Sequence, residues 1–410
     1  MKGKIFLNYI SLFSSAGIGC YGFLEEGFKC VATSELLAKR LDIQKANEKL
    51  KYSEGYICGD ISEKENKKQL YKVVDNYKIN ENVDDIDVIL FTAPCQGMSV
   101  ANHKKNDGTI VKNSLVVEAL EIISVIKPKI FIAENVRSFM NTQCIDHDAK
   151  KTIREAFQSW LENDYDYEER ILNFKEFGAN SSRTRTLVIG VRKDIRYSNN
   201  VSDLFPQKEQ PKTLKEIIGY LPSLKNMGEI SPNDIYHNFK PYKEYMRKWI
   251  APLKEGQSAF DNDKPDLRPH RIVNGEIVQN VNKNGDKYKR QSWDKVGPCI
   301  HTRNDIISSQ NTVHPSDDRV FSIRELMLLM NIPENFKWTS KYTLKELNKL
   351  NYEEKKDFLK KNEMTIRHSI GEAIPTIIIQ KIAKNIIEIE KKEFYSNEYK
   401  KNHKQLQFTF

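Results

Sequence analysis

Residues 4–22 read KIFLNYISLFSSAGIGCYG, an apolar segment followed by a turn of small residues and then by the start of a helix. The apolar segment, Lys4–Phe13, predicts a buried strand, and Gly17–Gly22 fits the spacing GxGxxG. Small residues in such a turn let a ligand approach the backbone at the N-terminus of the next helix. The turn is typical of sites for NAD, FAD and S-adenosylmethionine alike, and it also occurs as a plain tight connection between strand and helix.

Strand and helix patterns alternate through the rest of the first half of the chain. Further strands are predicted at residues 29–34, 55–58, 87–92, 129–133 and 186–191, with helices at 36–49 and 115–126. Such alternation over short connections favours an α/β fold with a doubly wound, mostly parallel sheet. Ligands of these sheets bind beyond the carboxyl ends of the strands, so the residues at those ends are the candidates for a site.

The hydrophobic pattern weakens after about residue 196, where Pro, Asn, Lys and Gly become frequent. We therefore predict that residues 1–196 form the α/β domain, that 197–318 form a smaller irregular domain, and that 319–410 return to the first domain. The last segment is expected to hold a helix at 376–389 and a frayed polar tail.

Composition limits the class of protein. The chain has 410 residues, of which 39% are hydrophobic and 30% charged, as in soluble globular proteins. No apolar run approaches the ~18 residues of a membrane helix, and no signal peptide is recognisable. The six cysteines include no CxxC pair, which excludes a zinc ribbon and argues against a disulfide scaffold. A net charge of +9 permits a polyanionic partner. Because the chain also has 56 acidic residues, the net charge alone does not indicate such a partner.

One cysteine comes directly after a predicted strand. Pro94-Cys95-Gln96 follows the apolar segment 87–92 and lies in a loop rather than inside an element. A cysteine exposed in a loop can ionise to a thiolate nucleophile, whereas a structural cysteine lies among apolar neighbours. The tripeptide alone supports the two roles about equally.

Charged residues mark the ends of other predicted strands. Glu35 and Asp60 end the second and third strands, where an acid can hold ribose hydroxyls or an adenine amino group. Glu134 follows the strand 129–133. Arg183 and Arg185 precede the strand 186–191 at alternating positions, so we expect both guanidinium groups on one side. Each residue alone also has a structural interpretation, as a turn residue, a salt-bridge partner or a solvated strand edge.

Taken in order, these motifs resemble those of the C5-cytosine DNA methyltransferase family. The similar segments are 11–19 (SLFSSAGIG), with Ser11 for the usual Asp and Ser15 for the first Gly; 94–96 (PCQ); 134–136 (ENV); 181–185 (SSRTR), with Ser181 for Gln; 319–333 (RVFSIRELMLLMNIP); and 371–375 (GEAIP), with Glu372 for Asn.

The resemblance implies a Rossmann-like, S-adenosylmethionine-dependent methyltransferase fold, with residues 197–318 as the target-recognition domain. Cys95 would add to carbon 6 of cytosine, and Glu134 would hydrogen-bond or protonate ring nitrogen 3. Arg183 and Arg185 would hold that part of the base. S-adenosylmethionine would supply the methyl group for carbon 5, with the target base flipped out of duplex DNA. No metal is implied.

The same resemblance suggests binding residues. For the cofactor they are Phe13, Ser15, Ala16, Gly17, Gly19, Glu35, Asp60, Ile61, Pro94, Glu372 and Ala373. For DNA they are Gln96, Ser99, Lys104 and Lys105 near the nucleophile, and Lys287, Lys289, Arg290 and Arg303 in a basic stretch interleaved with aromatic residues. Cys299, in a second Pro-Cys pair, is rejected as the nucleophile because no Gln follows it.

Three rival interpretations are kept open. A nicotinamide dehydrogenase would explain the glycine turn and Glu35 but leaves the other motifs unexplained. A tRNA-cytosine C5 methyltransferase shares the catalytic motifs, although the long middle region favours duplex DNA. A non-catalytic DNA-binding protein on the same fold would not need Cys95 and Glu134. We expect double-stranded DNA as partner, no membrane, a monomer in a microbial cytoplasm or nucleoid, and a restriction-modification or orphan methylation system whose endonuclease is not needed for activity.

Overall fold

The computed structural model describes residues 6–94, 113–195, 200–281 and 285–407, with side chains described up to residue 392. It divides into two compact units. Unit 1 holds residues 1–173, 184–208 and 376–410, and unit 2 holds 174–183 and 209–375.

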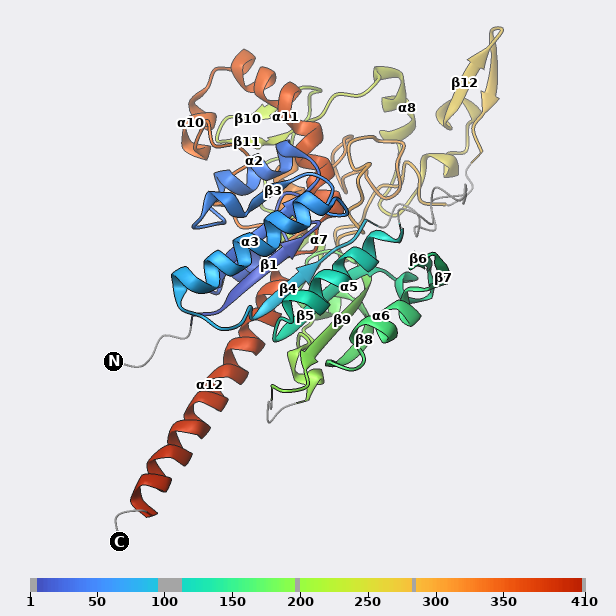
Figure 1. The fold of residues 1–410 in the computed structure, drawn as a ribbon. Coiled ribbons are helices and arrows are strands. Elements are labelled where there is room, and N and C mark those ends of the chain that lie inside the picture. Colours follow the sequence, from blue (N-terminus) through green and yellow to red (C-terminus); the bar gives the residue numbers. More distant parts are fainter. Residues whose placement is uncertain (1–5, 95–112, 196–199, 282–284, 408–410) are drawn as a thin grey trace. The chain divides into compact units, whose positions relative to one another are not determined.

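Unit 1 is built on a seven-stranded sheet of order β3-β2-β1-β4-β5-β9-β8 (Figure 1). The strands are β1 Asn8–Leu12, β2 Lys29–Glu35, β3 Tyr56–Cys58, β4 Val88–Phe91, β5 Ile130–Val136, β8 Tyr165–Asn173 and β9 Thr184–Arg192. The first five pair in parallel, while β9 is antiparallel to both β5 and β8. The predicted doubly wound, mostly parallel sheet is confirmed.

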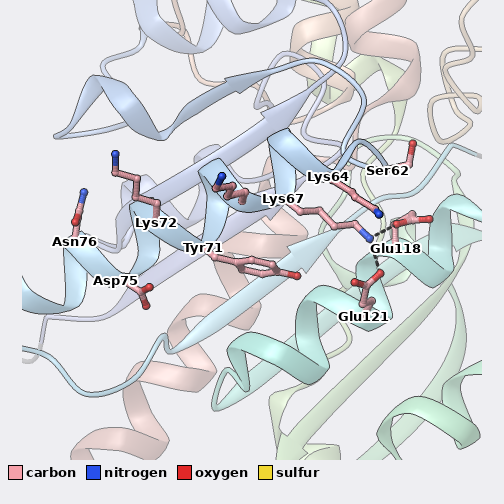
Figure 2. A pocket seen from close by; sticks show the side chains of 10 residues that line it. Ser62, Lys64, Lys67, Tyr71, Lys72, Asp75, Asn76, Glu118 and Glu121 are labelled. Carbon is pink, nitrogen blue, oxygen red and sulfur yellow. Dashed lines mark hydrogen bonds and ion pairs between the residues drawn. The ribbon is translucent and has the colours of Figure 1, made fainter.

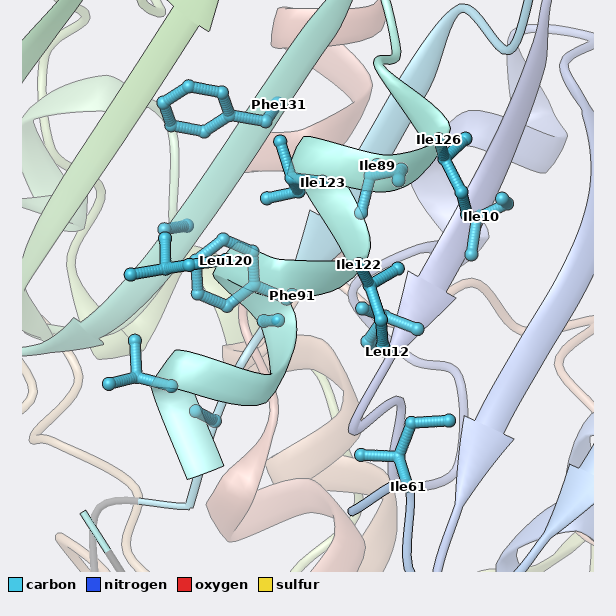
Figure 3. Packing of buried hydrophobic residues seen from close by; sticks show 14 of the residues in the cluster. Ile10, Leu12, Ile61, Ile89, Phe91, Leu120, Ile122, Ile123, Ile126 and Phe131 are labelled. Carbon is cyan, nitrogen blue, oxygen red and sulfur yellow. The ribbon is translucent and has the colours of Figure 1, made fainter. Parts of the chain in front are cut away.

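Helices cover both faces of this sheet (Figure 1). They are α1 Tyr21–Glu25, α2 Ala38–Ala46, α3 Lys64–Glu81, α5 Leu115–Ile126, α6 Ile153–Leu161 and α12 Thr376–Gln407, and a small hairpin adds β6 Gln143–Asp146 and β7 Ala149–Thr152. Figure 3 shows Leu120, Ile123 and Ile126 of α5 packed over side chains of β1 and β4. On the other face α12 approaches α1 so closely that a Cβ on Gly22 would lie 2.5 Å from the backbone nitrogen of Gln380. Glycine is therefore required there.

Unit 2 is irregular, as predicted for the middle of the chain. Its elements are α7 Leu214–Ile218, α8 Arg247–Ile250, α9 Ile323–Leu329, α10 Leu344–Lys349 and α11 Tyr352–Glu372, with the ribbons β10 Ile230–Ser231 and β11 Asp234–Asn238, and β12 His270–Val273 and β13 Glu276–Gln279. One of its cores gathers Trp249, Ile250, Tyr288, Val313 and neighbouring apolar residues.

The predicted boundaries differ from this division. Unit 2 extends to residue 375, whereas we expected a return to the first domain at 319. The reason is that α9 packs on β11 and α11 packs on α9, so both helices belong to the irregular unit. The polar tail also differs, because α12 continues to Gln407. No Gly or Pro interrupts residues 376–407, and nothing else in the sequence stops a helix there.

A buried ionic network holds the segment that precedes α9. Arg319, 1% exposed, donates two hydrogen bonds to Glu325, at 2.7 and 2.8 Å. Glu325 also accepts from the backbone of Ser322, and it closes the capping box that starts α9. His314 lies 3.4 Å from Glu325 through Nε2, while its Nδ1 accepts the backbone N–H of Asp317 at 3.0 Å. The imidazole is therefore held neutral, with its proton on Nε2.

This network predicts an acid-sensitive stability. Burial lowers the pKa of His314 to about 4, whereas an unfolded histidine titrates near 6.5. Between those values the unfolded chain binds a proton that the folded chain does not. The free energy of unfolding should therefore fall by up to about 3 kcal/mol as pH drops from 7 to 4. Thermal unfolding followed by tryptophan fluorescence at several pH values measures this fall.

A histidine variant isolates the contribution of the network. His314→Asn keeps an acceptor near Asp317 and should flatten the pH dependence between 7 and 4, at some cost in stability at neutral pH. His147→Asn, at a side chain that is 77% exposed, is the matched control and should keep the slope of the parent protein. Equal slopes in all three proteins would show that His314 does not carry the effect.

Candidate active site at the carboxyl edge of the sheet

The carboxyl ends of β1 to β5 meet at one edge of the sheet. β1 lies between β2 and β4, so the chain leaves this edge in opposite directions on either side of β1. Crevices at such a switch point are where open α/β sheets bind ligands. Five of the predicted segments lie at this edge: the turn after β1, Glu35, Asp60-Ile61, Pro94 and Glu134.

The turn after β1 has an unusual backbone. Phe13, Ser15 and Gly17 have positive φ values of 54°, 46° and 79°. Ser15 thus adopts the left-handed conformation that favours glycine, at the position where the resembled motif has Gly, which costs about 1 kcal/mol. The backbone N–H of Ser15 donates to Glu35 Oε2 at 2.8 Å, and Gln44 donates to its carbonyl at 2.6 Å. These bonds hold the turn in place despite the serine.

Glu35 ends β2 and is only 4% exposed. Besides Ser15, its carboxylate accepts the backbone N–H of Leu37 at 3.0 Å and lies 3.3 Å from Nη1 of Arg40. In this structure the carboxylate therefore braces the glycine turn against α2. Ala16 is buried in the same turn, and Gly19 lies just before α1.

Asp60 and Ile61 follow β3 at the same edge. The Asp60 side chain is exposed, and its Oδ1 accepts from the backbone and hydroxyl of Ser62 at 2.9 and 2.8 Å. Ile61 is 2% exposed and packs into the core below. The acid thus presents a carboxylate at the surface above an apolar floor.

The stretch that leads to the predicted nucleophile is held by β5. Cys95 itself, with Gln96, Ser99, Lys104 and Lys105, lies outside the described residues. Asn135 of β5 donates its amide to the carbonyl of Ala93 at 2.9 Å and is buried. We did not predict a role for Asn135, although it stands next to Glu134 in the ENV motif.

Glu134 and Arg185 are brought together by strand pairing. Val136 pairs with Arg185 and Glu134 with Leu187 across β5 and β9, so the two charged side chains are diagonal neighbours on one face. Nε of Arg185 lies 3.1 Å from Oε1 of Glu134, which is 6% exposed. The arrangement presents a buried carboxylate next to a guanidinium at the edge where β5 ends.

Comparison with known proteins identifies the family. The model of the C-5 cytosine-specific DNA methylases matches residues 7–388. The chain belongs to the C-5 cytosine-specific DNA methylases. It is thus a DNA (cytosine-5-)-methyltransferase, and the recognition made on the motifs is confirmed.

Two curated relatives of this methylase are Type II methyltransferases of bacteria. It is 28% identical to the Type II methyltransferase M1.HgaI of Avibacterium volantium, over 92% of this chain and 97% of the relative. It is 25% identical to the Type II methyltransferase M1.HphI of Haemophilus parahaemolyticus, over 94% and 88%. The crystal structure of the S. pombe Dnmt2 methyltransferase matches with a TM-score of 0.55 at 14% identity, over 93% of this chain and 98% of that one, which shows the shared fold.

Arg183 makes side-chain hydrogen bonds within unit 2 of the methylase. Arg183 belongs to unit 2 and is 3% exposed. Its guanidinium donates to the carbonyls of Ile300, Gly371 and Glu372 at 2.9, 3.2 and 3.1 Å. Within unit 2 the Arg183 guanidinium thus links the loop at Ile300 to the end of α11, and its predicted role beside Arg185 stays a prediction.

The GEAIP segment, residues 371–375, accepts the hydrogen bonds of Arg183 through the carbonyls of Gly371 and Glu372. A Cβ on Gly371 would lie 2.5 Å from the backbone carbon of His301, so only glycine lets α11 approach that loop. Glu372 is exposed and Ala373 is buried, both in unit 2, and their role toward a cofactor stays a prediction.

The structure does not support the predicted DNA contact of Arg290, which lies in the basic stretch. It is 4% exposed, and its guanidinium donates to the carbonyls of Ile250, His314 and Asp317 and to the carboxylate of Asp318. A base or phosphate could reach it only by breaking this network, so we correct its role to a structural one. Lys287 is partly exposed, Lys289 is partly exposed and lies 3.2 Å from Asp286, and the Arg303 side chain is 57% exposed.

A surface groove of unit 1 lies between α3 and α5 (Figure 2). In it Lys67 lies between Glu118 and Glu121 and forms ion pairs with both. Among the residues that the structure describes, no cluster of His, Cys, Asp and Glu is arranged to hold a metal ion, and no helix is long and apolar enough to cross a membrane.

Proposed function

We propose that this methylase transfers the methyl group of S-adenosylmethionine to carbon 5 of a cytosine in a specific sequence of double-stranded DNA, with Cys95 as the covalent nucleophile. The single observation that carries the proposal is the Glu134–Arg185 pair, buried at the edge of the sheet where the stretch leading to Cys95 also ends.

The chemistry explains why these residues are needed. Carbon 5 of cytosine is a poor nucleophile, and addition of a thiolate at carbon 6 converts it to an enamine-like carbon. Charge then develops on the ring, and the Glu134 carboxyl would stabilise it by hydrogen bonding or proton donation at nitrogen 3. Arg185 would orient Glu134 and lie near the base oxygen. After carbon 5 has taken the methyl group, a base removes its proton and the Cys95 thiolate leaves carbon 6, which restores the ring. The target base must leave the duplex to reach this edge, at a cost of a few kcal/mol.

The residues present fit S-adenosylmethionine. Bound at the switch point, this group would supply an electrophilic methyl carbon. Glu35 ends β2 and Asp60 follows the adjacent strand β3, and both offer carboxylates suited to ribose hydroxyls and an adenine amino group, beside the turn in which Phe13, Ser15 and Gly17 have positive φ values.

Cofactor affinity tests this placement. Glu35→Ala and Asp60→Ala should each raise the dissociation constant of S-adenosylhomocysteine roughly ten- to a hundredfold, because each removes a charge-assisted hydrogen bond worth about 1.5–3 kcal/mol. Calorimetric titration measures it, with Asp75→Ala on α3 as a control that should bind like the parent protein. Because Glu35 also holds the turn in place, the affinity of Glu35→Gln, which keeps the size of the side chain, is measured together with that of Glu35→Ala. Unchanged affinity in both Glu35 variants and in Asp60→Ala would remove these residues from the site.

The setting of the reaction is proposed by analogy with the relatives named Type II methyltransferases. We propose a monomer in a bacterial cytoplasm that modifies DNA in a restriction-modification system, with no need of the endonuclease for activity. Cytosine-methylation sequencing of DNA and tRNA from cells that express this chain tests the substrate. Methylation of one DNA sequence context is the expected result, whereas methylation confined to tRNA, or none, would contradict the proposal.

A further inference from the structure

The ribbon of β12 and β13 in unit 2 carries exposed aliphatic side chains close together. Ile272, Val273 and Ile277 are 70%, 42% and 48% exposed. The two strands are joined by Asn274-Gly275, which have φ values of 51° and 84°, as a tight hairpin turn requires. Figure 1 shows the ribbon standing out from the rest of the unit.

The base of the ribbon is fixed while its outer part is open. The backbone of Asn280 donates to the carbonyl of Pro269 at 2.9 Å, and the side chain of Gln279 donates to that of Pro265 at 2.8 Å. The ring of His270 lies 5.3 Å from that of Trp249, which belongs to a core of the unit. A Cβ on Gly275 would meet nothing within 4 Å.

Strand register places Ile272 and Ile277 together on one face, whereas Val273 lies on the other face. Ile272 pairs directly with Ile277, and Arg271 pairs with Val278 on the opposite face. An isolated two-stranded ribbon is only marginally stable, and it gains nothing from apolar side chains that face water. Exposed aliphatic residues on such a fixed ribbon therefore indicate a surface that another molecule covers.

We propose that this ribbon enters the major groove of the substrate duplex and reads base edges there. The inference rests on the proposed function and names the part of unit 2 that selects the target sequence. Two strands about 4.8 Å apart, with their side chains, fit a groove about 12 Å wide. Ile272 and Ile277 would contact thymine methyl groups, and Arg271, on the opposite face, would donate to a backbone phosphate.

The residue types favour DNA over a second copy of the chain. Exposed Arg271, Glu276 and Gln279 are interleaved with the aliphatic side chains, and all three are types that hydrogen-bond to bases. A face that joins two copies would instead have an apolar centre from which charged residues are depleted.

A sequence-preference measurement tests the ribbon. The double variant Ile272→Ser, Ile277→Ser should methylate a library of random duplexes with roughly 5- to 100-fold less discrimination at one or more positions of the target, read by cytosine-methylation sequencing. Arg271→Ala, which leaves the isoleucine pair intact, should weaken binding to all duplexes about equally and keep the sequence preference. Ile79→Ser, at an isoleucine that is 77% exposed on α3, is the control and should keep the preference of the parent protein.

Each other outcome has a defined meaning. An unchanged preference profile in the double isoleucine variant, with or without a uniform loss of rate, would overturn base reading by the ribbon. Dissociation of a parent dimer by the double variant, seen by sedimentation, would assign the ribbon to self-association instead. Failure of the parent protein to methylate cytosine in any duplex would contradict the proposed function itself, independently of the ribbon. Equal thermal unfolding of the variants excludes a folding defect.

Discussion

Replacing Cys95 by serine should lower the rate of methyl transfer by on the order of a thousandfold or more, because serine cannot supply a thiolate for covalent addition to the ring. Binding of duplex DNA and of S-adenosylhomocysteine should stay within a few-fold of the parent values, since no binding group is removed. Single-turnover transfer of a labelled methyl group measures the rate, and gel-shift titration measures the affinity.

The matched control is Cys299→Ser. Cys299 is an exposed free cysteine that also follows a proline, but it lies in unit 2. Its replacement should leave the transfer rate unchanged. A large loss in Cys299→Ser together with an active Cys95→Ser protein would reverse the assignment of the nucleophile.

Glu134→Gln should lower the methyl-transfer rate about 10²- to 10⁴-fold, the range typical of a lost proton donor. The amide keeps the size of the side chain but cannot donate the proton to ring nitrogen 3, and it does not carry the charge that pairs with Arg185. The dissociation constant for duplex DNA should change much less than the rate, because the loss falls on the transition state. Single-turnover kinetics at saturating DNA and cofactor separate the two.

A matched ion pair serves as control for this variant. Arg154 of α6 and Glu169 of β8, both in unit 1, lie 2.6 Å apart. Glu169→Gln should retain full activity. If Glu134→Gln and Glu169→Gln behaved alike, Glu134 would be a structural partner of Arg185 and not part of the chemistry.

The sequence predicts the sheet and its functional edge well because both depend on local patterns. Glu35 ends one apolar strand, Asp60 follows the next strand, and Glu134 lies near the end of a third. Parallel pairing brings the ends of these strands to one edge of the sheet. The helix α3 is not among the predicted elements because its sequence is rich in lysine, yet Leu70, Val73, Val74 and Tyr77 follow the helical spacing and are buried.

Long-range partners could not be predicted in the same way. Arg183 bonds to carbonyls 117, 188 and 189 residues further along the chain, and no local pattern indicates them. Arg290 stands in a basic stretch typical of DNA contacts, but its partners Ile250 and Asp318 come from distant segments that bury it. The limits of unit 2 depend likewise on helices α9 and α11, whose packing on β11 and on each other only the structure shows.

Covalent trapping tests the central claim most directly. A duplex with 5-fluorocytosine at the target position cannot lose its fluorine after methyl transfer, so the enzyme should remain attached to the DNA through its nucleophile. Peptide mapping of the complex by mass spectrometry should find the base on Cys95. Attachment to Cys299 or to any other residue, or no adduct from a preparation that methylates the unmodified duplex, would contradict the account.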